Sequence, residues 1–176
     1  MMPKQFYPDF RAGSVLTADF AKLYDRGVRF IVFDADNTLV SYEETKPSGR
    51  ILELVKELKD AGFGMCILSN GHKERIKKLA AALGMGFEGD AFKPSRKGFR
   101  RVFEQYGVTG SETLVVGDQI FTDVWGASRS SCLSLLVRPI SSKKEPPFVR
   151  LKRIPEKIFL RKIDKFSECI DLPQAR

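Results

Sequence analysis

The sequence contains no long hydrophobic run, few cysteines and a single histidine. No stretch approaches the roughly 20 apolar residues that a membrane-spanning helix needs, and residues 1–12 are polar and aromatic, unlike a secretory signal. The three cysteines, Cys66, Cys132 and Cys169, are odd in number and irregularly spaced, which argues against a disulfide framework and a zinc site. We therefore expect a cytoplasmic protein in which Cys66 and Cys132 pack as small hydrophobic residues.

Short, nearly continuous apolar runs alternate with segments of helical periodicity. The runs resemble buried parallel strands and cover residues 28–33, 63–68, 113–116 and 132–137. Helices are expected from Ser48 to Gly62, from about His72 to Gly84 and from Ser95 to Gly107. This alternation predicts an α/β protein of three layers, α/β/α and Rossmann-like, with a central parallel sheet that binds ligands at the carboxyl ends of its strands.

Four polar clusters lie at the ends of apolar runs or in the loops between them. They are Asp34-x-Asp36-Asn-Thr38, Ser69-Asn70, Lys93-Pro94, and Gly117-Asp118 with Asp123 five residues further on. Because the strands are expected to be parallel, Asp34, Ser69 and Asp118 meet at one edge of the sheet. Several carboxylates in one crevice repel one another unless a hard cation offsets their charge, so the pattern favours Mg²⁺.

A carboxylate beside such a cation can attack a phosphate ester in line. Asp34 would form an aspartyl-phosphate that water then hydrolyses, with Lys93 neutralising charge. Asp36, two residues away on the same loop, could protonate the leaving oxygen and later activate the water. The clusters together therefore predict phosphoryl-transfer chemistry.

The ordered motifs resemble the haloacid dehalogenase superfamily, whose pattern is DxDx[TV], then Ser or Thr, then Lys, then GDxxxxD. The resemblance implies that Asp34 is the nucleophile and a metal ligand, and that Asp36 is the acid/base and gives its backbone carbonyl to the metal. It implies Asp118 and Asp123 as further metal ligands, with Thr38, Ser69, Asn70 and Lys93 at the phosphate.

Single members of the pattern also have plainer interpretations. Asn70 is equally typical of a turn, Asp123 of the first turn of a helix, and Thr38 of a loop cap. His72, the only histidine, fits the start of a helix better than a contact to the leaving group.

The spacing of the motifs leaves no room for a cap domain. Only 32 residues separate Asp36 from Ser69, and 23 separate Ser69 from Lys93. An open crevice admits bulky substrates, or a second subunit supplies the cap.

Within the superfamily the chain resembles the small uncapped YqeG-type phosphatases of subclass IIIA, which are related to phosphatidylglycerophosphate phosphatases. Segments such as Phe33-Asp-Ala-Asp-Asn-Thr-Leu39 and Val116-Gly-Asp-Gln-Ile-Phe-Thr-Asp123 carry this resemblance. This resemblance implies a phospholipid headgroup phosphate as substrate.

Charge is concentrated near the C-terminus. The formal net charge is +8, and residues 138–165 hold ten Lys or Arg against three acids. With 176 residues and 43% hydrophobic content, we expect one phosphatase domain over 1–140, in which 1–27 covers an edge of the sheet, and a basic extension over 141–176. Ser141 to Pro147 is typical of a linker, and Pro155 of a first helical position.

Three interpretations of the extension stay open. An apolar helix face comprising Ile158, Phe159, Ile163 and Phe166 could dock on the domain. A basic amphipathic helix within residues 143–166 could instead contact anionic lipid, which would place the protein peripherally at a membrane. Nucleic-acid binding is the third, although no helix-turn-helix, cluster of stacking aromatic residues or zinc pattern supports it.

For the function of the whole chain, the alternatives to a phospholipid phosphatase are a phosphatase for a small soluble phosphate and a non-catalytic module that binds nucleic acid.

Overall fold

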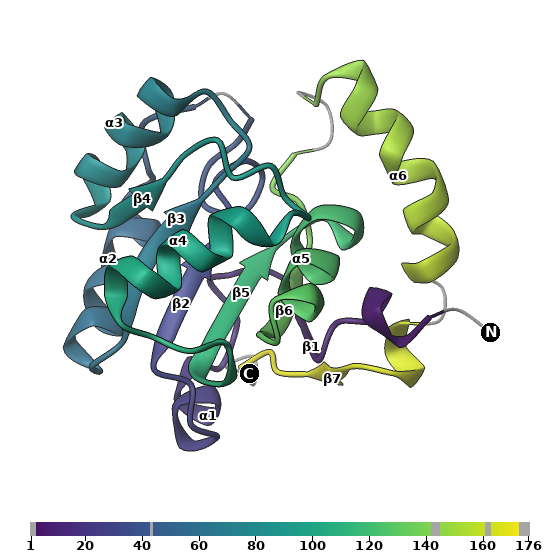
Figure 1. Ribbon diagram of the computed structural model, residues 1–176, viewed down its shortest axis with the longest axis horizontal. Coiled ribbons are helices and arrows are strands. Elements are labelled where there is room, and N and C mark those ends of the chain that lie inside the picture. The colour runs from purple at the N-terminus through teal and green to yellow at the C-terminus, as the bar shows by residue number, and fades with distance from the viewer. Residues whose placement is uncertain (1–2, 43, 142–144, 161–162, 173–176) are drawn as a thin grey trace.

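The computed structural model describes residues 3–42, 44–141, 145–160 and 163–172 (Figure 1). Its centre is a seven-stranded sheet in the order β4-β3-β2-β5-β6-β1-β7, and every neighbouring pair is parallel. The strands are β1 (Phe10–Ala12), β2 (Phe30–Phe33), β3 (Gly64–Leu68), β4 (Gly86–Glu88), β5 (Thr113–Gly117), β6 (Leu133–Val137) and β7 (Glu168–Cys169). The four strands expected from the sequence are confirmed, and three of them start one or two residues later than predicted.

Helices connect the strands. They are α1 (Phe20–Asp25), α2 (Gly49–Asp60), α3 (Lys73–Leu83), α4 (Arg96–Tyr106), α5 (Trp125–Arg129) and α6 (Pro147–Leu160), and the short turns η1 (Lys4–Phe6), η2 (Gly110–Glu112), η3 (Ile120–Val124) and η4 (Ile163–Lys165) add to them. Ser48 and Ser95 cap α2 and α4 with their hydroxyl groups, as predicted, because each accepts a hydrogen bond from a backbone N–H in the first turn.

The two faces of the sheet carry separate apolar layers. On one face, Ile31 and Phe33 of β2 belong to a cluster with residues of α1, α2 and α3. On the other face, Phe30 and Val32 join a cluster with α4 and α5. Successive side chains of a strand alternate between faces, so one short apolar strand supplies both layers. The predicted three-layer α/β/α arrangement is confirmed.

Both ends of the chain contribute to the sheet. Within residues 1–27, expected to cover a sheet edge, Phe10–Ala12 form β1, which lies inside the sheet between β6 and β7. Within the extension expected over 141–176, Glu168–Cys169 form β7 and pair with β1. The same sheet therefore includes strands from both ends of the described chain.

The prediction that Pro155 occupies a first helical position is wrong. Pro147 occupies that position in α6, and Pro155 lies inside the helix. A proline at either place has a compatible φ, but only the first position avoids the loss of a backbone hydrogen bond. Of the expected apolar face, Ile163 is buried and Phe166 is 55% exposed. The side chains of Ile158 and Phe159, and residues 143–144 and 161–162 of the expected membrane-contacting stretch, lie outside the described residues.

Helix α6 lies to one side of the sheet in Figure 1, and it contacts η3. Nowhere in the described part of the chain is a helix both long and apolar enough to cross a membrane.

Candidate active site

The ends of three neighbouring strands place the polar clusters together. Asp34 directly follows β2, Asp118 follows β5, and Ser69 follows β3, and β2 lies between the other two strands. Phe33 is in register with Val116, and the backbone N–H of Asp34 donates to the Val116 carbonyl (2.8 Å). The sheet therefore brings the three clusters to one edge, as the sequence predicts.

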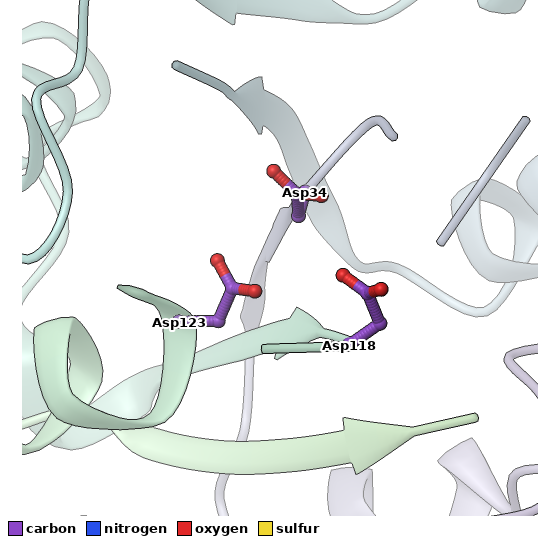
Figure 2. A group of neighbouring side chains, drawn as sticks. All are labelled: Asp34, Asp118 and Asp123. Atoms are coloured by element: carbon purple, nitrogen blue, oxygen red, sulfur yellow. The ribbon is translucent and has the colours of Figure 1, made fainter. Parts of the chain in front are cut away.

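Three carboxylates converge at this edge. Figure 2 shows the side chains of Asp118 and Asp123 extending toward Asp34. Each offers an oxygen within 4.8 Å of the others, and the residues are only 6%, 4% and 2% exposed. Oδ2 of Asp34 and Oδ1 of Asp118 are buried and have no hydrogen-bond partner among the described residues. Unpaired buried carboxylate oxygens are costly, and hard divalent cations prefer oxygen ligands, so this donor set fits such a cation.

Two of these carboxyl groups have raised pKa values, which indicates that the positive charge around them does not offset their burial. Burial raises the pKa of Asp34 to about 7, although the charge of Lys93 acts in the opposite direction. Burial likewise raises the pKa of Asp118 well above its ordinary value, against the charge of Arg153. A further cation at the unpaired oxygens would favour the ionised form of both carboxylates.

Lys93 bridges two members of the cluster. Its Nζ donates to Oδ1 of Asp34 (2.6 Å) and to Oδ1 of Asp123 (2.7 Å). Burial disfavours the charged amine, but Asp123 and Asp34 outweigh this effect and raise the pKa of Lys93. Asn70 fixes the main chain of the same residue, because the Lys93 N–H donates to Asn70 Oδ1 (2.7 Å) and Asn70 Nδ2 donates to the Lys93 carbonyl (3.1 Å). Asn70 therefore positions Lys93.

Gly117 allows Asp123 to reach the cluster. Asp123 lies in η3, and its Oδ2 accepts a hydrogen bond from the Gln119 backbone N–H (3.1 Å). A Cβ atom on Gly117 would lie only 2.3 Å from Cγ of Asp123, a distance that real side chains do not adopt. The glycine of the Gly117-Asp118 pair is thus explained by close packing.

The remaining residues of the predicted site surround this centre. Oδ2 of Asp36 accepts a hydrogen bond from Nη2 of Arg75 in α3 (2.5 Å), a partner that the motif does not reveal. Oγ of Ser69 accepts from the Gly71 N–H (3.0 Å). Thr38 is 1% exposed, and its hydroxyl has no partner among the described residues. Asp36 is therefore oriented by Arg75, and the buried Thr38 hydroxyl keeps its hydrogen-bonding capacity.

Arg153, from α6, contacts the cluster from the C-terminal side. Its Nη1 donates to the Asp118 carbonyl (2.7 Å), and its Nη2 donates to the Asp118 carboxylate. The same guanidinium donates to Oε1 of Glu145 (2.5 Å) and to Oε2 of Glu156 (3.2 Å). One cation from the basic extension thus pairs with three carboxylates.

The two glutamates connect α6 to the loops of the site. Asn37, whose φ of 63° lies in the left-handed region, donates from Nδ2 to Oε1 of Glu145 (2.9 Å). Oε1 of Glu156 accepts from the Ile120 backbone N–H (2.7 Å). The sequence pattern does not single out Glu145, Arg153 or Glu156. One signal in the sequence was available, namely that Glu145 and Glu156 are isolated acids in an otherwise basic stretch. In the structure they are 5% and 2% exposed.

Comparisons with known proteins agree with this geometry. Residues 40–130 match the model of the haloacid dehalogenase-like hydrolases. The chain is 34% identical to "Probable phosphatase YqeG" of Bacillus subtilis, over 81% of this chain and 83% of that protein. It is 29% identical to "Phosphatidylglycerophosphate phosphatase 1, chloroplastic/mitochondrial" of Arabidopsis thaliana, of which it spans 44%. A haloacid dehalogenase-superfamily hydrolase of Ehrlichia chaffeensis has the same fold, with a TM-score of 0.53, 15% identity and coverage of 73% of this chain and 96% of that one.

Proposed function

The chain belongs to the haloacid dehalogenase-like hydrolases and is a phosphatase of that family, and on this basis we propose that it is a Mg²⁺-dependent phosphomonoesterase that acts through Asp34. The observation that carries the proposal is the buried group of Asp34, Asp118, Asp123 and Lys93, in which one oxygen of Asp34 and one of Asp118 are left without a partner. Such oxygens are available to a phosphate and to a cation.

The reaction that we propose has two displacements. An oxygen of Asp34 attacks phosphorus while the bond to the leaving alcohol breaks, and Asp36 gives its proton to the departing oxygen. A water molecule then attacks phosphorus, Asp36 takes a proton from it, and the bond between phosphorus and Asp34 breaks to release phosphate. Arg75 holds Asp36 by one oxygen in the structure and so orients it for both steps.

The surrounding residues would bind the phosphate and limit repulsion between charges. Lys93 compensates the charge of Asp34 and Asp123, while Ser69, Asn70 and Thr38 would complete the phosphate-binding group. Asp34 and Asp118 would hold Mg²⁺ together with the backbone carbonyl of Asp36, and Asp123 would support them. When bound, the cation neutralises the carboxylates and polarises the phosphoryl oxygens.

We propose a phospholipid headgroup phosphate as the substrate class. Two features support this: the similarity to a protein named as a phosphatidylglycerophosphate phosphatase, and the basic character of residues 138–165. Exposed apolar side chains on α6, Leu151 at 67% and Ile154 at 60%, lie beside its cations, as in helices that bind anionic membrane surfaces. The protein would then act in the cytoplasm, peripherally at a membrane.

Phosphate release tests the chemistry. We expect wild-type protein to hydrolyse phosphatidylglycerophosphate in mixed micelles with Mg²⁺ and to lose activity with EDTA. Asp34→Asn should lower kcat by roughly a thousandfold or more, whereas Asp60→Asn, a matched change at an exposed residue of α2, should not. Absence of metal-dependent turnover on any phosphate ester would contradict the proposal. If sugar phosphates or nucleotides are turned over faster than phosphatidylglycerophosphate, the substrate class is a soluble phosphate and not a lipid.

Sedimentation with vesicles tests the membrane contact separately. Vesicles containing anionic lipid should retain the protein at low salt and release it as salt rises, because the attraction is electrostatic. Equal retention on neutral vesicles would contradict this part of the proposal.

A further inference from the structure

A cavity of about 910 Å³ lies between α6 and the ends of β1 and β6. Asp118 and Arg153 line it, so it extends from the cluster of carboxylates. Apolar side chains from β6, η3, α6 and η4 form much of its wall, among them Leu136, Ile120, Leu151, Ile154 and Ile163. This volume is at the upper end of the roughly 300–1,000 Å³ typical of small-molecule sites. It exceeds what a single phosphate group requires.

The cavity also contains positive charge that is not paired with acidic residues in the described part of the chain. Arg138, Arg150 and Lys157 line it, and none of them forms an ion pair with another residue in the described part of the chain. The acids of the same wall are already engaged: Glu145 and Glu156 pair with Arg153, and Asp171 accepts hydrogen bonds from Thr17 and Gly13.

We propose that this cavity binds a second anionic group of the substrate, a phosphodiester, through Arg138, Arg150 and Lys157. This inference rests on the proposed function, which places the phosphate to be cleaved at Asp34. A substrate that continues from there past Asp118 enters the cavity, where the apolar wall accommodates its hydrocarbon parts. The substrate class is therefore an amphiphile with one phosphomonoester and one phosphodiester. The three cations would favour such a substrate over phosphate esters that lack the second phosphate.

A pair of soluble substrates tests the role of the cations without a membrane. Glycerophosphoglycerophosphate carries both phosphates and no acyl chain, whereas glycerol 3-phosphate carries only the monoester. The variant combines Arg138→Gln, Arg150→Gln and Lys157→Gln. The control combines Lys56→Gln, Lys59→Gln and Lys77→Gln, three exposed residues of α2 and α3, and so removes the same charge.

We expect the cavity variant to lower the ratio of kcat/KM for glycerophosphoglycerophosphate to that for glycerol 3-phosphate by about tenfold, chiefly through KM, because three exposed charge contacts are lost. The control should keep the wild-type ratio. An unchanged ratio in the cavity variant, or an equal fall in the control, would overturn the inference. A dihexanoyl form of the larger substrate with a higher kcat/KM than the deacylated form identifies the lipid, rather than a soluble diester, as the source of the second phosphate.

Binding separates this inference from the catalytic proposal. Titration of glycerophosphoglycerophosphate into Asp34→Asn, with and without the three cavity substitutions, requires no turnover. If wild-type protein is inactive but the cavity substitutions weaken binding about tenfold, the catalytic proposal fails and the anion site stands. If they leave binding unchanged, the anion site is excluded.

Discussion

Arg153 donates hydrogen bonds to both the backbone carbonyl and the carboxylate of Asp118, although 34 residues separate them in the sequence. The pair joins the C-terminal helix α6 to the end of β5. Because Glu145 and Glu156 share the same guanidinium, three largely buried carboxylates depend on one cation. The conformation of the site is thereby coupled to the docking of α6.

Replacing Arg153 should destabilise the fold. Arg153→Met would leave Asp118, Glu145 and Glu156 without their cation, and the loss of one partner of a buried pair costs about 3–5 kcal/mol. We expect a fall of this size in the free energy of unfolding measured with urea. The control is Arg100→Met, whose pair with Glu104 is exposed and should contribute less than about 1 kcal/mol. Equal effects of the two substitutions would contradict the network.

Adding one methyl group at Gly117 should impair catalysis. In Gly117→Ala the new Cβ would collide with Asp123, which must move and weaken its ion pair with Lys93. We expect kcat to fall by about tenfold or more, since small displacements of catalytic groups have large effects. Gly49→Ala, where a Cβ meets nothing within 4 Å, is the control. The measurement is steady-state kinetics with any phosphate ester that the enzyme accepts. If kcat of Gly117→Ala equals that of the wild type, the close packing of Asp123 against Gly117 is not needed for catalysis.

The three cysteines should differ in reactivity. Cys66 and Cys132 are buried, and burial raises the pKa of both thiols, that of Cys132 to about 12. Cys169 is exposed. Iodoacetamide at pH 8 should therefore modify Cys169 in the folded protein and the other two only after unfolding, because the thiolate is the reactive form. Mass spectrometry of the labelled peptides measures this, and rapid labelling of Cys66 in the native protein would disagree with its packing.

Acid should weaken the edge of the sheet formed by β7. Glu168 accepts hydrogen bonds from Arg26 and pairs with Lys22, which lower its pKa from 4.5 to about 2. A depressed pKa means that the stabilisation is present above pH 4.5 and is lost as pH falls toward 2. Glu168→Gln should remove this component of the pH dependence of unfolding, whereas Glu57→Gln, an exposed change on α2, should retain it. If the free energy of unfolding falls with pH in the same way in wild type and in Glu168→Gln, the prediction is wrong.

Local patterns were sufficient to predict the central strands, three helices and the residues at the strand ends. Asp34, Ser69 and Asp118 follow apolar runs, and parallel pairing necessarily brings such positions together. Arg75, Glu145, Arg153 and Glu156 could not be predicted in this way, because their contacts depend on tertiary packing between distant segments. The strand at Phe10–Ala12 is short, and its partners follow more than 120 residues later, so no local signal marks it.

The position of β1 has a consequence for synthesis on the ribosome. Its partners β6 and β7 are translated more than 120 residues later. This early strand therefore remains unpaired while β2 to β5 are synthesised and can pair with one another. Contacts between segments so distant in sequence form slowly. The arginine that contacts Asp118 also lies in this late segment. A nascent chain that has emerged only through η3 therefore carries Asp34, Asp118 and Asp123 before it can complete either the sheet or the charge balance around them.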